Sequence, residues 1–272
     1  MFKKLNLCIY FFIVVSCNKS FDGFAPSVQS ISNPPALVTP VPFTPIQITG
    51  IHTWFDASDV ALINTSSGKI ISWLDKYNNL IQLSQSTAAS QPAYQSNVIN
   101  GKNAAYFDGI DDSMQANIVN ALGSEITISY VVQLSNFANK IPFTLNTTNY
   151  SYGPDIYFSG GKLAWNTGDS IVNAFSNSAY PSLNAPHIIT IKNSQISNTA
   201  SLYLDTVFIG TANYRNTIIT DFSAPRIYIG NWVTGSYFMN GYFAELIIYN
   251  KVISETERAD MEFYLKNKWG IL

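Results

Sequence analysis

Carboxylates are the side chains in this sequence that could act as general acids, bases or nucleophiles. Its glutamates are Glu125, Glu245, Glu255, Glu257 and Glu262. Cleavage of a glycosidic bond needs two carboxylates that face each other across about 5 to 10 Å. No Glu-x-Asp-x-Glu run is present to place two acids on one face of a strand. Asp111 and Asp112 are adjacent, and adjacent strand residues point to opposite faces. The carboxylate pattern therefore predicts no catalytic pair.

The chain has too few histidines and cysteines for most sites that depend on these residues. The histidines are His52 and His187, and both cysteines, Cys8 and Cys17, precede position 20. A histidine-rich metal site, a histidine-based triad and a disulfide in the later chain are therefore not expected. Each histidine is expected to be a strand residue with a satisfied ring. The sequence also has no Gly-x-Ser-x-Gly elbow, phosphate loop or His-Glu zinc motif.

Aromatic rings next to amide side chains form a second kind of candidate site. The candidate ligand-binding residues are Tyr150, Tyr152, Trp165, Tyr214, Arg215, Trp232 and Tyr237. A sugar offers apolar C–H faces to a ring and hydroxyl groups to amides. The same rings could equally pack in the core or in turns. As a set they favour recognition of a ligand by loops.

The overall charge is low. Charged residues make up 12% of the chain, about half the usual share in a soluble domain, and the formal net charge is −2. Because no basic stripe is present, nucleic-acid binding is not expected. Aromatic residues reach 14%, which favours strands over helices.

Residues 1–16 have the pattern of an export signal. Lys3 and Lys4 precede an apolar run over 5–15 that is too short to span a bilayer. Val14-Val15-Ser16-Cys17 resembles the lipobox of bacterial lipoproteins. That resemblance implies cleavage before Cys17, acyl chains on it and anchoring in the bacterial cell envelope, at the outer membrane or cell surface. An ordinary signal peptide or a short N-terminal membrane anchor is the alternative.

Residues 17–47 differ in composition from the rest of the chain. Six of the twelve prolines fall here. Proline at this density blocks helices and central strands and favours an extended chain. We therefore expect a tether over 17–47 and a folded domain over 48–272.

Short segments rich in β-branched and aromatic residues follow one another from position 48 onward. The clearest predicted strands are 125–134 and 239–249, and the step from Leu204 to Val207 predicts a hairpin. Further strands are expected near 48–58, 69–75, 91–94, 102–108, 113–116, 141–146, 155–159, 162–166, 170–175, 187–193, 200–205, 207–212 and 226–232. Many short strands without a propeller or solenoid repeat predict an all-β, two-sheet antiparallel jelly-roll sandwich.

One C-terminal α-helix is expected over 254–269. Ser254 and Glu257 form a capping box, and Gly270 is placed to end the helix. One apolar stripe would pack it on the sandwich, formed by Met261, Tyr264, Leu265 and Trp269.

Together these segments resemble the laminin-G-like, concanavalin A-like jelly-roll domains of bacterial secreted and surface proteins. The resemblance rests on the order and spacing of Trp54-Phe55-Asp56-Ala57-Ser58, Ile71-Ser72-Trp73-Leu74-Asp75, Gln91-Pro92-Ala93-Tyr94, Phe107-Asp108-Gly109, Gly241-Tyr242-Phe243-Ala244-Glu245 and Lys268-Trp269-Gly270-Ile271. It extends over essentially all of 48–272. It implies two antiparallel sheets and a concave face that often binds glycans or proteins.

Members of that family frequently hold calcium, and the resemblance implies Asp108, Asp111 and Asp112 as its carboxylate ligands here. Calcium takes six to eight oxygens, so this turn supplies part of a shell. Asp and Gly are also ordinary turn residues, so a solvated Asx turn is the alternative. The family often has Asp before the late-strand Glu, where this chain has Ala244, and this difference weakens the expectation of metal. No cofactor is required.

We therefore expect an exported, membrane-anchored, non-catalytic module that binds glycans or host or envelope proteins. A structural or assembly role in the cell envelope is one alternative, and a glycan-active hydrolase or lyase is another. Glu245, with Ala244 beside it and no second carboxylate in register, is expected to be structural or solvated.

Overall fold

The computed structural model describes residues 42–120, 122–136, 140–146, 155–159, 162–166, 172–174, 181–194, 196–213, 226–232 and 235–272. These residues belong to one compact unit, Pro42–Leu272. The predicted signal peptide, Cys17 and most of the predicted tether lie outside the described residues. Among the described residues, no helix is long and apolar enough to cross a membrane.

Strands dominate the described residues. They are β1 (Ile51–Asp56), β2 (Ile63–Ser66), β3 (Lys69–Leu74), β4 (Gln82–Ser84), β5 (Ala93–Ile99), β6 (Lys102–Asp108), β7 (Met114–Asn117), β8 (Glu125–Leu134), β9 (Lys140–Asn146), β10 (Asp155–Ser159), β11 (Lys162–Asn166), β12 (Val172–Ala174), β13 (His187–Ser194), β14 (Thr199–Leu204), β15 (Val207–Asn213), β16 (Arg226–Ile229) and β17 (Asn240–Tyr249). The helices are α1 (Glu255–Trp269) and three short 3₁₀ turns, Pro45–Gln47, Val60–Leu62 and Ala88–Ser90.

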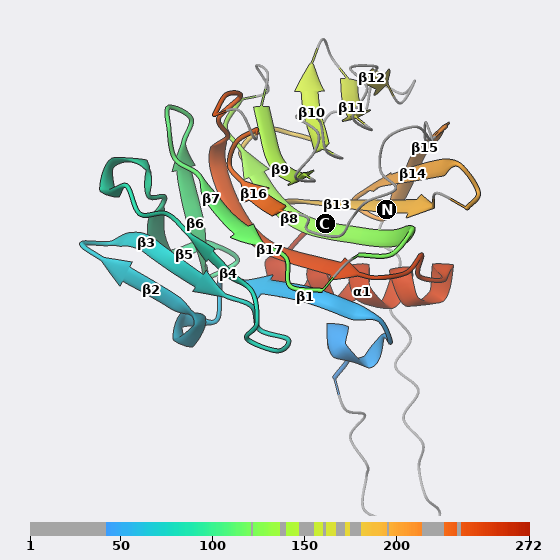
Figure 1. Ribbon diagram of the computed structural model, residues 1–272, viewed down its shortest axis with the longest axis horizontal. Helices are drawn as coiled ribbons and strands as arrows, with labels where there is room; N and C mark the ends of the chain where they lie inside the picture. The colour runs from blue at the N-terminus through green and yellow to red at the C-terminus, as the bar shows by residue number, and fades with distance from the viewer. Residues whose placement is uncertain are drawn as a thin grey trace, which may run out of the picture. The chain divides into compact units, whose positions relative to one another are not determined.

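The first sheet is built around β17. Strand β8 pairs along one edge of β17, while β6 and β1 share the other edge, β6 beside 240–243 and β1 beside 245–249. Beyond β8 the sheet continues through β13, β14 and β15, and β5 pairs with β6. All of these pairs are antiparallel, and Figure 1 shows β8, β17 and β1 side by side.

The second sheet runs in the order β2, β3, β4, β7, β16, β9, β10, β11 and β12, again with antiparallel pairs. A single pair, Lys69 with Ala93, joins β3 to β5 of the first sheet. The two-sheet antiparallel jelly roll expected from the sequence is therefore confirmed. The sequence missed β2 and β4, which are short and polar.

The main core lies between the two sheets. Phe243, Leu246 and Ile248 of β17 face it, and Phe143 of β9 and Ile229 of β16 meet them from the other sheet. Each of these side chains is fully buried. Alternate strand residues point to opposite faces, so the remaining apolar residues of β17 face away from this core.

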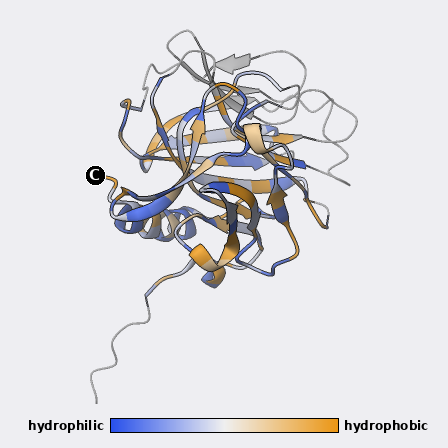
Figure 2. Ribbon diagram, turned by 90° about the vertical axis from the view of Figure 1, so that its left-hand side faces the viewer, coloured by the Kyte–Doolittle hydropathy of each residue, from blue (hydrophilic) through white to orange (hydrophobic). Residues whose placement is uncertain are grey.

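Helix α1 covers that other face of the first sheet. Met261, Leu265 and Trp269 of α1 pack with Ile247 and Tyr249 of β17. The capping box is present, with the Glu257 amide donating to Ser254 Oγ and the Ser254 amide donating to the Glu257 carboxylate. In Figure 2 the outward side of α1 is mostly hydrophilic. The predicted C-terminal helix is confirmed.

The folded unit begins before position 48. Phe43 contacts the Tyr264 ring at a centroid distance of 6.3 Å, and Tyr249 Oη donates to the Pro45 carbonyl at 3.1 Å. Residues 42–47 therefore pack as part of the domain instead of extending from it.

Candidate functional site

Glu245 is held inside the domain by a β-bulge. Phe243 pairs with Val132 and Glu245 with Val131, so Ala244 is an extra residue in β17. This turns Glu245 toward α1, where its carboxylate is fully buried. The indole nitrogens of Trp54 and Trp269 donate to the Glu245 carboxylate at 2.7 and 2.6 Å.

Lys268 joins Glu245 to a second buried carboxylate. Its Nζ lies 2.7 Å from Glu245 Oε2 and 2.7 Å from Asp56 Oδ1. Burial raises the pKa of Glu245 despite the opposing charge of Lys268. Burial would also raise the pKa of Asp56, but Lys268 and Lys76 outweigh it and hold that pKa below its usual value. Since neither carboxylate is open to solvent, Glu245 is structural, and the solvated option for it is wrong.

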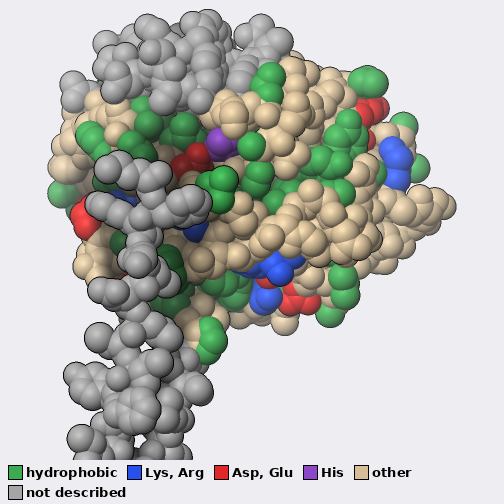
Figure 3. All heavy atoms as spheres, turned by 180° about the vertical axis from the view of Figure 1, so that it is seen from behind, with side chains coloured by type: hydrophobic (Ala, Val, Ile, Leu, Met, Phe, Trp, Pro, Cys, Tyr) green, Lys and Arg blue, Asp and Glu red, His purple; other side chains and the backbone are tan. Residues whose placement is uncertain are grey.

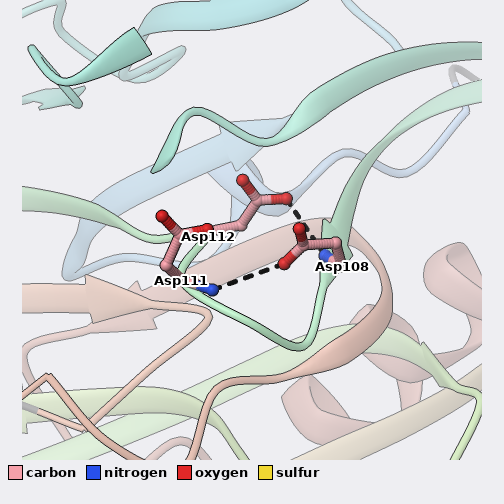
Figure 4. A group of neighbouring side chains, drawn as sticks. All are labelled: Asp108, Asp111 and Asp112. Atoms are coloured by element: carbon pink, nitrogen blue, oxygen red, sulfur yellow. Dashed lines mark hydrogen bonds between the residues drawn. The ribbon is translucent and has the colours of Figure 1, made fainter. Parts of the chain in front are cut away.

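The acidic turn after β6 brings its three aspartates together. One oxygen each from Asp108, Asp111 and Asp112 lies within 4.8 Å of the others. Asp108 Oδ1 accepts hydrogen bonds from the amides of Ile110 at 2.8 Å and Asp111 at 3.4 Å, which forms the expected Asx turn. Figure 4 shows the group, with the Asp108 amide donating to Asp112 Oδ2 at 3.0 Å. Asp111 and Asp112 share this site because the chain turns here.

Asp112 has the most unusual environment of the three. It is 2% exposed, and its Oδ1 has no hydrogen-bond partner among the described residues. Burial raises the pKa of Asp112 to about 6, and the neighbouring charge of Asp108 acts in the same direction. An unpaired buried oxygen beside two further carboxylates is the type of ligand that a hard cation such as calcium prefers. The turn would supply only part of the six to eight oxygens that calcium takes.

Asp112→Asn is expected to stabilise the calcium-free protein at pH 8 by about 1–2 kcal/mol, because it removes a buried charge that lacks a full set of partners. Wild-type stability should rise as the pH falls from about 6 toward 4, since the folded state binds this proton more tightly than the unfolded chain does. Urea unfolding at pH 8 and pH 4 measures both effects. Asp260→Asn, an exposed carboxylate on α1, is the control.

Calcium is expected to reverse this order if the turn binds it. The ion would then stabilise the wild type, because a ligand that binds only the folded state raises its stability. It would leave Asp112→Asn unchanged, because this variant lacks one of the carboxylates. Equal midpoints with added calcium and with a chelator would contradict the metal and leave the Asx turn as the whole role of the cluster.

A loop from Gly230 to Met239 lies against the acidic turn. A Cβ atom at Gly230 would lie 2.3 Å from the Phe107 ring and 3.0 Å from the Asp112 carbonyl oxygen. The loop returns to the same turn, where Asn240 Nδ2 donates to the Asp108 carbonyl at 2.9 Å. Both ends of this loop are therefore fixed beside the carboxylates.

Two of the predicted aromatic residues lie on this loop. The Trp232 and Tyr237 rings are in contact at a centroid distance of 5.7 Å, and Tyr237 is 44% exposed. Trp165 is a β11 residue that pairs with Ile156 of β10. Tyr150, Tyr152, Tyr214 and Arg215 lie outside the described residues, as does Cys17. Of the predicted set, the structure brings Trp232 and Tyr237 together.

A polar hollow that the sequence analysis missed crosses the outer face of the second sheet. Its two adjoining parts have volumes of about 250 and 310 Å³ and share Gln82, Ser84 and Gln115. One row of its lining residues is in register across four neighbouring strands, in the order Asn64, Ser72, Ser84 and Gln115. The row spans three strand spacings of about 4.8 Å, or about 14 Å. The hollow is therefore elongated, and amides and hydroxyls make up most of its lining, together with Ile71, Ala116 and Arg226.

In the sequence, the signal for this hollow is the alternation of exposed polar residues with buried apolar residues in two short strands. Gln82 and Ser84 are exposed on either side of the buried Leu83. Gln115 and Asn117 alternate in the same way with Met114 and Ala116 in β7. Among the described residues, no carboxylate lines either part of the hollow. Figure 3, which views the molecule from behind, shows acidic and basic side chains in small groups on a largely uncharged surface.

His187 forms a hydrogen-bonded cluster at the start of β13. Its Nδ1 lies 2.6 Å from Asp205 Oδ2, and its Nε2 lies 3.1 Å from Ser182 Oγ and 3.0 Å from the Ser182 carbonyl oxygen. Asp205 lies in the turn between β14 and β15 and also accepts from the Ile188 amide at 2.8 Å. Ser182, His187 and Asp205 thus have the arrangement of a Ser-His-Asp triad, which the sequence did not predict. To act as a catalyst, such a relay would also need an oxyanion site. The role that these contacts support is structural, because they fix the β14–β15 hairpin to the start of β13.

Comparison with protein families gives a match to the family described as the concanavalin A-like lectin/glucanases superfamily, over residues 107–257. The match covers more than half of the chain. No curated protein matches the sequence.

Solved structures of similar fold include domain 4 of AbnA, a GH43 extracellular arabinanase from Geobacillus stearothermophilus, in complex with arabinotriose. It has a TM-score of 0.56 and 13% identity, with 78% of this chain and 98% of that domain covered. The botulinum neurotoxin serotype D ligand-binding domain in complex with N-acetylneuraminic acid has a TM-score of 0.55 and 13% identity, with 79% and 51% covered. Trypanosoma rangeli sialidase has a TM-score of 0.53 and 12% identity, with 81% and 33% covered. This chain thus spans about half of the toxin domain and a third of the sialidase.

Proposed function

Because this chain belongs to the concanavalin A-like lectin/glucanases superfamily, we propose that it is a non-catalytic module that binds glycans in the polar hollow of its second sheet. The main support for this proposal is the row of amides and hydroxyls in register across β2, β3, β4 and β7. Amides and hydroxyls both donate and accept, which matches the hydroxyl groups of a sugar. Similar folds solved with arabinotriose and N-acetylneuraminic acid support a saccharide as ligand class.

The side chains of the hollow are available for a ligand. Within the described part of the chain, Gln82, Ser84, Gln115 and Asn117 are exposed, and none of their side chains takes part in a hydrogen bond of the fold. A ligand would therefore replace water at these groups without breaking contacts that stabilise the domain. This favours a binding role for the row over a structural one.

The position of the carboxylates supports binding without catalysis. Glycosidase chemistry needs a carboxylate pair at the bound sugar. No carboxylate is found among the described residues that line the hollow, and Glu245 and Asp56 are enclosed beneath α1 with Lys268. A hydrolase or lyase would therefore need acids from elsewhere in the chain. An assembly role in the envelope is the remaining alternative.

Binding in the hollow is tested with a filling variant. Ser84→Tyr adds a ring at an exposed position in the middle of the row, so it is expected to lower affinity for glycans at least about 10-fold with little change in stability. Ser66→Tyr, exposed on β2 outside the hollow, is the matched control. A glycan array and calorimetry on the purified full-length protein provide the measurement. No glycan binding by the wild type, together with co-purifying envelope proteins, would favour the assembly role.

The proposal includes export and anchoring through Cys17, with the proline-rich segment after it as a tether. Two or more acyl chains would give stable anchoring. Cys17→Ala is expected to move the protein from the membrane fraction to the soluble exported fraction. Unchanged partitioning would contradict the lipid anchor and leave the binding proposal standing.

A further inference from the structure

Arg226 is the charged side chain among the residues that line the polar hollow. It is the first residue of β16 and pairs across the sheet with Asn117 of β7. Its side chain is exposed, and no ion pair or hydrogen bond is made by it within the described ranges. The guanidinium thus lies among amides and hydroxyls, and no carboxylate of the described residues neutralises it.

The sheet register places Arg226 diagonally beyond one end of the row. Gln115, the last member of the row, pairs with Tyr228, and Arg226 lies two residues before Tyr228 on the same strand face. Asn117, directly opposite Arg226, lies two residues after Gln115 on the same face of β7. A ligand that follows the row from Asn64 to Gln115 would therefore end beside the guanidinium and two amides.

The chemistry of this corner differs from that of the rest of the hollow. A guanidinium presents paired N–H donors that match the two oxygens of a carboxylate, and such charge-assisted hydrogen bonds are about twice as strong as neutral ones. The side-chain amides of Gln115 and Asn117 can donate to the same anion or bind the hydroxyls next to it. Because none of the described lining residues is an acid, a carboxylate would meet no like charge from them.

We infer that the Arg226 end of the hollow selects glycans that carry a carboxylate on the sugar bound there, such as uronic-acid oligosaccharides. The inference rests on the proposed function, because it assigns a ligand class to the same hollow. It adds a direction to binding: the neutral sugars lie along the Asn64–Gln115 row and the acidic sugar lies at Arg226. Because Arg226 is exposed, the preference for the acid should weaken as salt screens the charge.

The test uses a matched pair of probes, a uronic-acid trisaccharide and the same trisaccharide with its carboxylates converted to methyl esters. Esterification removes the charge and preserves the sugar. The full-length wild type is expected to bind the acid at least about 10-fold more tightly than the ester at low salt. Arg226→Gln should bind both probes at the ester's level. Arg226→Lys should retain part of the preference, since it keeps the charge and loses the paired donors.

Lys266→Gln is the control, because it removes one positive charge from α1 and leaves the hollow unchanged. It should keep the wild-type preference for the acid, and circular dichroism establishes that all variants are folded. Equal binding of acid and ester by the wild type, or an acid preference retained in Arg226→Gln, would overturn the inference. Tighter binding of a sulfated neutral trisaccharide than of the uronic acid would also overturn it.

These outcomes separate the inference from the proposed function. If Ser84→Tyr abolishes binding of both probes and the wild type shows no preference, the glycan site stands and the role of Arg226 is wrong. If the wild type binds neither probe nor any glycan on the array, the proposed function fails and the inference fails with it.

Discussion

Lys268→Met is expected to destabilise the domain by about 3–5 kcal/mol, the usual cost of leaving buried charges without their partner. The lysine Nζ lies 2.7 Å from Asp56 and 2.7 Å from Glu245, whose side chains are 2% and 0% exposed. Methionine fills similar space and supplies no charge. Urea unfolding at pH 7 measures the loss. Lys266→Met, two residues earlier on α1, is the control and should change stability by less than about 0.5 kcal/mol.

The pH dependence identifies the cause of that loss. Without Lys268, the pKa values of Asp56 and Glu245 in the folded state should rise, so the folded state binds protons more tightly than the unfolded chain. Stability of Lys268→Met should then increase as the pH falls from 8 to 5, and its gap to the wild type should narrow. Adding Glu245→Gln should recover about 1–2 kcal/mol, because it removes the buried charge that has no cation left, whereas Asp56 keeps Lys76. A gap that is independent of pH would indicate lost packing instead of unpaired charge.

Gly230→Ala is expected to cost about 3 kcal/mol. The residue has φ +91°, which strains any side chain by about 1–2 kcal/mol, and its Cβ would lie 2.3 Å from the Phe107 ring. Relief of that overlap in a packed core adds about 1–3 kcal/mol. Thermal unfolding measures the cost. Tryptophan fluorescence reports whether the loop that carries Trp232 has moved away from the acidic turn.

Gly235→Ala is the matched control on the same loop. Its φ is +73°, but a Cβ there would meet no atom within 4 Å. It should therefore cost only about 1 kcal/mol, from backbone strain alone. Equal losses in the two variants would show that the contact of Gly230 with Phe107 and Asp112 contributes nothing.

Elements with a strong local pattern were predictable from the sequence. β8 was expected at its observed bounds, and α1 was expected from Ser254 and Glu257, which make both hydrogen bonds of the capping box. β2 and β4 were missed because each has only three or four residues and a largely exposed, polar composition. Their pairing is decided by the neighbouring strands, which a local pattern does not contain.

The candidate site was less predictable for the same reason. The sequence pointed to aromatic residues in loops, and Trp232 and Tyr237 do lie together, on the loop whose two ends contact the acidic turn. The row from Asn64 to Gln115 draws on four strands, so it exists only once their register is known. The environment of Glu245 likewise depends on Trp54 and Lys268, which are remote from it in sequence or belong to another element.

The ion pairs that join Asp56 and Glu245 through Lys268 also have a consequence for the order of folding. Asp56 on β1 and Glu245 on β17 share Lys268. Glu245 therefore gains its cation only after α1 has been synthesised and has docked, whereas Asp56 also pairs with Lys76. Strand β1 also pairs with β17, the last strand of the chain to be synthesised among the described residues. This gives the domain a high contact order, and such topologies fold slowly. We expect a nascent chain that lacks α1 to remain unfolded, a state that suits the export that we propose for this protein.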